Sequence, residues 1–123
     1  MTEPLRLLFV DDDADIRAIV TLSLGLDRAI VPVAVGTAEE ALAAVRTGSG
    51  FDAALLDVTM PVMDGPALFR MLRAIVPGLP VIFMTAHSRD HEVAALRAAG
   101  AVGVIVKPFE PLTLAAQVRA LLA

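Results

Sequence analysis

The chain has 123 residues, of which 57% are hydrophobic, and it carries ten Lys and Arg residues against fourteen Asp and Glu residues. This length suits one domain with one buried core, and no apolar stretch approaches the roughly 20 residues of a membrane span. The net charge of -4, the lack of a Lys/Arg cluster and the presence of only five aromatic residues, all Phe, argue against direct binding to nucleic acid.

The N-terminus lacks the basic start and apolar stretch of a signal peptide, and the chain contains no cysteine. We therefore expect a cytoplasmic protein without membrane insertion, whose partners are other proteins and a cation.

Short apolar runs alternate with helical patterns five times along the chain, which is typical of βαβ units around a parallel sheet. The runs predict strands at residues 5–10, 30–35, 53–57, 80–85 and 102–106. The apolar spacings and capping residues predict helices from Ala14 to about Leu26, over 38–46, from an Asp64 cap to Ile75, from a Ser88 cap to Gly100, and from Pro111 to Leu122.

Pro32 lies inside the second predicted strand, where it cannot donate a ladder hydrogen bond unless the strand is at a sheet edge. The strand order 2-1-3-4-5 places the second strand at an edge and the first beside the third. The predicted fold class is therefore α/β, a flavodoxin-like doubly wound parallel sheet of five strands with five helices.

Four of the apolar runs end in polar residues suited to phosphoryl transfer, namely Asp11-Asp12, Asp57, Thr85 and Lys107. The carboxyl ends of parallel strands meet at one edge of a sheet, so these side chains should form one site. Lys107 is the only lysine in the chain, and the other nine Lys and Arg residues are all arginine.

Three carboxylates packed together repel one another, and oxygen ligands at such a site favour Mg²⁺ as the counter-cation. Asp57 could then attack phosphorus and form an aspartyl phosphate. Thr85 could donate its hydroxyl hydrogen to one phosphoryl oxygen, and the Lys107 ammonium could pair with another.

Together these motifs resemble the receiver domain of two-component response regulators along essentially the whole chain. The segments that carry the resemblance are Val-Asp11-Asp12, Leu-Asp57-Val-Thr-Met-Pro-Val-Met-Asp64-Gly65, Met-Thr85-Ala and Val-Lys107-Pro-Phe. The resemblance implies a single receiver domain over residues 1–123, either free-standing or part of a larger protein.

The resemblance also implies the roles of the site residues. Asp57 would accept a phosphoryl group from a sensor histidine kinase or a phosphotransfer protein, and Thr85 and Lys107 would bind that group. Asp12, Asp57 and the carbonyl of Thr59 would hold Mg²⁺, with Asp11 acting through water. The protein would catalyse only its own phosphorylation and dephosphorylation.

The same resemblance predicts a cis peptide bond at Lys107-Pro108. It further implies that phosphorylation changes the surface offered to a downstream protein effector. The fourth helix, fifth strand and fifth helix would form the contact face, which could also support a dimer.

One departure concerns Val104, which stands where many receivers have an inward-turning Tyr or Phe. We therefore expect the loop after Thr85 and the fourth helix to carry most of the signal. Thr59 and His87 are expected to influence the lifetime of the phosphoryl group.

Other interpretations stay open at this point. The acids Asp11 to Asp13 could be helix caps, Thr85 could be an ordinary strand residue, and His87 with His91 could bind a transition metal. Asp64-Gly65 is interpreted as a structural turn and cap, outside the site.

Two alternative functions also remain. A phosphatase of the haloacid dehalogenase type would need an acid two residues after its nucleophile, where this chain has Thr59. A pseudo-receiver would keep the fold without being phosphorylated.

Overall fold

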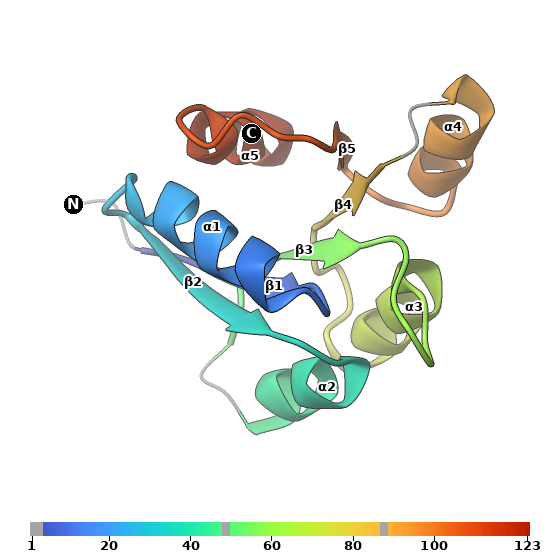
Figure 1. Ribbon diagram of the computed structural model, residues 1–123. Helices are drawn as coiled ribbons and strands as arrows, with labels where there is room; N and C mark the ends of the chain where they lie inside the picture. The colour runs from blue at the N-terminus through green and yellow to red at the C-terminus, as the bar shows by residue number, and fades with distance from the viewer. Residues whose placement is uncertain (1–3, 48–49, 87–88) are drawn as a thin grey trace.

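In the computed structural model, which describes residues 4–47, 50–86 and 89–123, a parallel sheet is covered on both faces by helices (Figure 1). The strands are β1 (Leu5–Val10), β2 (Ile30–Val35), β3 (Ala53–Asp57), β4 (Val81–Thr85) and β5 (Gly103–Val106). The helices are α1 (Ala14–Gly25), α2 (Ala38–Thr47), α3 (Gly65–Ile75), α4 (Asp90–Ala98) and α5 (Leu114–Leu122). The strand order β2-β1-β3-β4-β5 confirms the predicted fold.

Two hydrophobic clusters lie on opposite faces of the sheet because neighbouring side chains along each strand point to opposite sides. In β1, Leu8 and Val10 pack in the cluster with α2 and α3, while Leu7 and Phe9 pack in the cluster with α1 and α5. The central strands β3 and β4 are buried along their whole length. The sheet is thus a rigid platform whose carboxyl edge holds the polar residues.

Pro32 lies on the edge strand β2, opposite Leu7 of β1, as the sequence predicts. The Ala29 carbonyl accepts from the Leu5 amide of β1, and the Val35 carbonyl accepts from the amide of the residue directly after β1. Since alternate residues of a parallel strand bond to the same neighbour, residue 32, three positions from each, faces away from β1. The donor that proline lacks is therefore missing from the free edge.

The predicted helix starts are confirmed at three sites and corrected at one. The Asp13 carboxylate accepts from the amides of Asp15 and Ile16, Thr37 Oγ1 accepts from the Glu40 amide at 3.1 Å, and Asp64 Oδ1 accepts from the Ala67 amide at 2.9 Å. These three residues cap α1, α2 and α3.

The prediction that Pro111 opens the last helix is wrong, because α5 begins at Leu114. The Thr113 amide donates to the Glu110 carbonyl at 3.1 Å, and the Leu112 amide donates to Glu110 Oε1 at 3.2 Å. These bonds close a turn before the helix. Ser88 lies outside the described residues, and Arg89 occupies the N-cap of α4 without a side-chain cap bond. β4 and β5 each begin one residue later than predicted.

Candidate functional site

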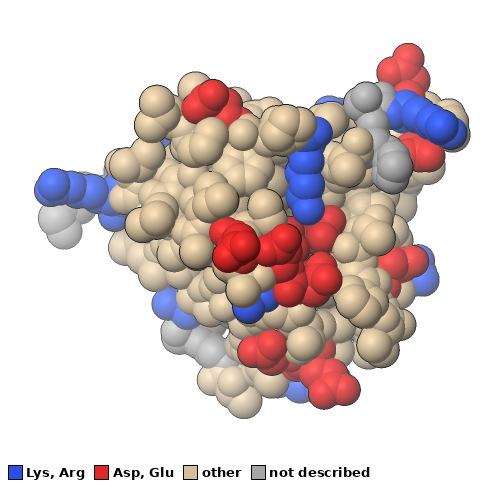
Figure 2. Space-filling model, viewed as in Figure 1, with Lys and Arg blue, Asp and Glu red and all other residues tan. Residues whose placement is uncertain are grey.

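The strand endings meet at the carboxyl edge of the sheet, where β1, β3 and β4 lie side by side. Asp11, Asp57 and Thr85 are buried, with 1%, 6% and 4% of their surface exposed, whereas Asp12 is exposed. Figure 2 shows acidic side chains gathered near the middle of this face, with a basic side chain beside them. The structure therefore brings together acids that are far apart in the sequence.

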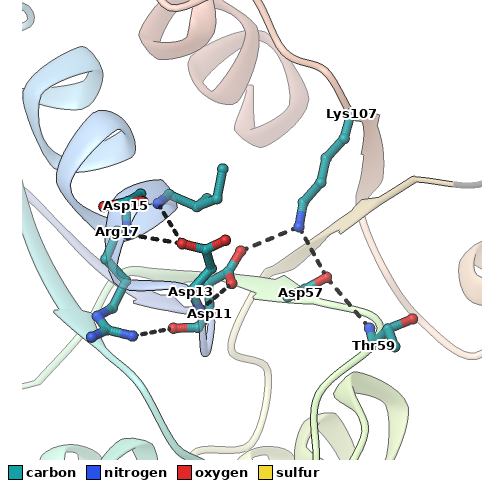
Figure 3. A network of polar contacts seen from close by, with 8 residues as sticks. Asp11, Asp13, Asp15, Arg17, Asp57, Thr59 and Lys107 are labelled. Atoms are coloured by element: carbon teal, nitrogen blue, oxygen red, sulfur yellow. Dashed lines mark hydrogen bonds and ion pairs between the residues drawn. The ribbon is translucent and has the colours of Figure 1, made fainter.

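All four polar groups of Asp11 have hydrogen-bond partners, and Figure 3 shows the bonds with Asp13, Arg17 and Lys107. Its amide donates to the Val35 carbonyl at 3.2 Å, and its carbonyl accepts from Arg17 Nη1 at 2.8 Å. Its Oδ1 accepts from the Asp13 amide at 2.9 Å, while its Oδ2 accepts from Lys107 Nζ at 3.2 Å. The position of this carboxylate is thus fixed from four directions.

Lys107 joins the two buried carboxylates. Its Nζ lies 3.2 Å from Asp11 Oδ2 and 3.3 Å from Asp57 Oδ1. Burial lowers the pKa of Lys107, but the two carboxylates outweigh burial and raise that pKa above its ordinary value. The side chain is therefore a fixed cation, and its peptide bond to Pro108 is cis, as predicted.

Asp57 ends β3, and its Oδ1 also accepts from the Thr59 amide at 3.4 Å. Burial raises its pKa, the negative charge of Asp11 raises it further, and Lys107 and the Thr59 amide oppose them without cancelling the increase. The surroundings of Asp57 therefore favour the protonated form of its carboxyl group. A second cation beside Lys107 would favour the ionised form instead.

Thr85 ends β4, the strand that pairs with β3 on the side away from β1. Its carbonyl accepts from the Lys107 amide at 2.7 Å, which ties the ends of β4 and β5 together. Thr85 and Lys107 therefore share one corner of the site. His87 lies outside the described residues. Its predicted influence on the phosphoryl group, and the predicted metal pair of His87 with His91, therefore stay predictions.

The acidic residues fit a divalent cation. Asp11, Asp12 and Asp57 each offer a carboxylate oxygen, and these three atoms lie within 4.8 Å of one another. Carboxylate oxygens with room for water are the ligands that Mg²⁺ prefers. The cluster could therefore hold the predicted ion. The role of the Thr59 carbonyl as a further ligand stays a prediction.

Two residues near the site were not predicted from the sequence to act there. A Cβ on Gly65 would press on the backbone carbonyl of Asp57 and lie 3.0 Å from the Val58 Cα, so α3 begins directly against the end of β3. Arg17, on α1, holds the Asp11 carbonyl. Asp13 caps α1, so the helix-cap interpretation of the acidic run is right for that residue.

The sequence model of the response regulator receiver domain matches residues 7–119. The chain belongs to this family. Among related proteins, the transcriptional regulatory protein PrrA of Mycobacterium tuberculosis is 42% identical over 123 residues, which are 99% of this chain and 51% of PrrA. The DNA-binding response regulator MtrA of Mycobacterium leprae is 39% identical over 118 residues, which are 94% of this chain and 50% of MtrA. The receiver therefore spans about half the length of these relatives.

Solved receiver structures resemble the fold over nearly the whole chain. The chemotaxis protein CheY4 of Vibrio cholerae superposes with a TM-score of 0.85 at 30% identity and covers 96% of this chain and 98% of its own. The BeF3-activated DrrB receiver domain gives a TM-score of 0.82 at 30% identity, with 97% of both chains covered. No helix in the described part of this receiver is long and apolar enough to cross a membrane.

Proposed function

We propose that this receiver is a signalling switch that is activated when Asp57 accepts a phosphoryl group from a histidine kinase or a histidine phosphotransfer protein. The observation that carries the proposal is the Lys107 ammonium between Asp11 and Asp57, 3.3 Å from Asp57 Oδ1. A nucleophilic carboxylate with a fixed cation beside it suits an incoming phosphoryl group, because the cation offsets the repulsion between the two anions.

In the proposed reaction an Asp57 oxygen forms a bond to phosphorus while the phosphorus–nitrogen bond of phosphohistidine breaks, and the imidazole leaves with the electron pair of that bond. Thr85 would donate its hydroxyl hydrogen to one phosphoryl oxygen, and Lys107 would pair with another. Lys107 can do so by moving from the Asp57 oxygen to the phosphoryl oxygens, since it keeps Asp11 as a second partner.

Asp12, Asp57 and the carbonyl of Thr59 are the proposed magnesium ligands, and Asp11 would act through a water molecule. Mg²⁺ would supply positive charge that screens the carboxylates from the phosphoryl oxygens. The chain's own part is to hold the three carboxylate oxygens within 4.8 Å of one another before the ion arrives.

Phosphorylation adds about -1.5 to -2 charges at the site. We propose that this charge acts through the segment after Thr85, whose residues 87 and 88 lie outside the described residues, and shifts α4, none of whose nine residues is buried. Val104 cannot make the large side-chain rotation of a Tyr or Phe at that position. The conformational change would therefore reach the face of α4, β5 and α5 through that segment. Comparing amide hydrogen exchange with and without a phosphoryl mimic tests this, and changes confined to other elements would contradict it.

The partners in this proposal are the phosphodonor protein and a downstream protein effector, in the cytoplasm. A dimer through the face of α4, β5 and α5 is part of the prediction, and sedimentation of the phosphorylated and unphosphorylated protein measures it.

Intact mass measured after incubation with acetyl phosphate and Mg²⁺ tests the central step. We expect a single phosphoryl adduct that needs the metal, disappears in Asp57→Ala and persists in Asp90→Ala, which alters an exposed acid on α4. A folded wild-type protein without any adduct would instead favour a pseudo-receiver.

A further inference from the structure

Arg17 reaches from α1 to the turn that carries the acidic pair. Its Nη1 donates to the carbonyl of Asp11 at 2.8 Å, and Figure 3 shows the guanidinium on the side of Asp11 away from Lys107. The Asp11 carbonyl belongs to the peptide bond that joins Asp11 to Asp12. A donor fixed on that oxygen sets the orientation of the peptide plane, because the plane is rigid, and hence the place from which the Asp12 side chain starts.

The guanidinium lies close to the backbone at Gly36. Gly36 follows β2, and a Cβ added there would lie 2.8 Å from Arg17 Nη1 and 3.2 Å from Arg17 Cζ. The absence of a side chain at residue 36 thus leaves the space that the Arg17 head group occupies. Arg17 therefore lies between the turn after β1 and the turn after β2.

We infer that Arg17 is a positioning residue for the divalent cation: by holding the Asp11-Asp12 peptide it places the Asp12 carboxylate beside those of Asp11 and Asp57. This inference rests on the proposed magnesium site. Groups that orient metal ligands in this way change affinity although they do not touch the metal.

The sign of the effect separates positioning from simple charge. A cation near a divalent-metal site repels the metal, so the loss of the Arg17 charge alone would tighten Mg²⁺ binding. The loss of positioning weakens it. Arg17→Met should therefore weaken Mg²⁺ binding by roughly tenfold, the lower end of the usual range for groups that orient ligands.

Gly36→Ala supplies an independent variant that changes no charge. The added methyl group displaces the guanidinium, which can yield because it is the end of a flexible side chain. We expect Gly36→Ala to weaken Mg²⁺ binding in the same direction as Arg17→Met. In the double variant, Gly36→Ala should have no further effect, since the group that it displaces is already gone.

The experiment is a Mg²⁺ titration of wild type, both single variants, the double variant and Arg46→Met, followed by calorimetry and by the amide resonances of Asp12 and Asp13. Arg46, exposed in the last turn of α2, matches the charge change and should leave the affinity within about twofold of wild type. The free energy of unfolding without Mg²⁺ is measured for each variant, which separates lost stability from lost affinity.

Unchanged or tighter binding by Arg17→Met overturns the inference, and so does a Gly36→Ala effect that persists in the double variant. If Arg17→Met does not fold, Gly36→Ala alone decides, because unchanged affinity in that variant overturns the inference. Failure of the wild type to bind Mg²⁺ would instead contradict the proposed magnesium site.

Discussion

Asp57 illustrates how one buried carboxylate links the site to the stability of the protein. Burial and the charge of Asp11 raise its pKa, so the folded chain binds this proton more tightly than the unfolded chain, whose Asp residues have a pKa of about 3.9. The ionised form therefore lowers stability, and the loss develops as pH rises from about 4 through the raised pKa of the folded state.

We predict that Asp57→Asn is more stable than wild type at neutral pH in buffer without divalent cations. The stability difference between the two proteins should shrink as pH falls and disappear below about 4, where the folded and unfolded states of the wild type both bind the proton. Urea unfolding at several pH values measures it, with Asp90→Asn as the comparison for an exposed acid. A wild type as stable as Asp57→Asn at pH 7 would contradict the prediction.

Gly65 lies where the chain leaves no room for a side chain. A Cβ there would meet the Asp57 carbonyl, the Val58 Cα at 3.0 Å and Phe83 Cε1 at 3.1 Å. Two of these neighbours are backbone atoms, so Gly65→Ala should lower the free energy of unfolding by about 1–3 kcal/mol, as overpacking usually does.

Denaturant unfolding measures this effect, and Gly25→Ala is the matched control. A Cβ at Gly25, the last residue of α1, meets nothing within 4 Å. The control should therefore gain stability, by up to about 1 kcal/mol, because alanine favours helix more than glycine. Equal losses in both variants would mean that the close approach at Gly65 is unimportant.

At the scale of elements, the start of α3 depends on one side chain. Asp64 Oδ1 accepts from the Ala67 amide at 2.9 Å. Asp64→Ala should cost about 0.5–2 kcal/mol of stability, the usual loss for an N-cap. Arg89→Ala is the control at the N-cap of α4, where no side-chain cap bond exists, and chemical denaturation should show a clearly smaller change there.

Element types and most boundaries could be predicted because their causes are local. The apolar runs placed the strands to within one residue, since each run is bounded by polar or turn residues. The start of α5 could not be predicted well, because Pro111 suits a first helical turn and the competing turn depends on bonds to Glu110. Nothing in the apolar pattern distinguishes these two conformations.

The candidate site divides in the same way. Asp11, Asp57 and Lys107 were predictable because parallel strands bring their ends to one edge, and the structure places them in contact. The roles of Gly65 and Arg17 could not be predicted, because each depends on how closely a helix approaches the turn after a neighbouring strand. The Gly in Asp64-Gly65 was visible in the sequence, but its contact with Asp57 needs the position of α3.

For the whole molecule, Asp27 and Arg119 join distant parts of the chain. Asp27 follows α1, and its carboxylate accepts from Arg119 of α5 and from the Ala29 amide. The Arg119 hydrogen bond, followed by that of the Ala29 amide, lowers the pKa of Asp27. Its contribution to stability is therefore present above the unfolded pKa of about 3.9 and is lost as pH falls through the lower folded pKa.

We predict that Asp27→Asn has a lower melting temperature than wild type at pH 7 and that the difference disappears in strong acid. This dependence is opposite to that of Asp57→Asn, so thermal scans of both variants over one pH series control for each other. A deficit in Asp27→Asn that persists at low pH would mean that packing, rather than charge, holds α5 to the end of α1.

Pro32 has a consequence beyond the single chain. An exposed strand edge invites pairing with a strand from another molecule, which is one route to aggregation. On β2 the proline faces the open side, so a strand arriving there finds one hydrogen-bond donor missing in the middle of the six-residue edge. Pro32 thus disfavours extension of the sheet by a strand of another molecule along the open edge of β2.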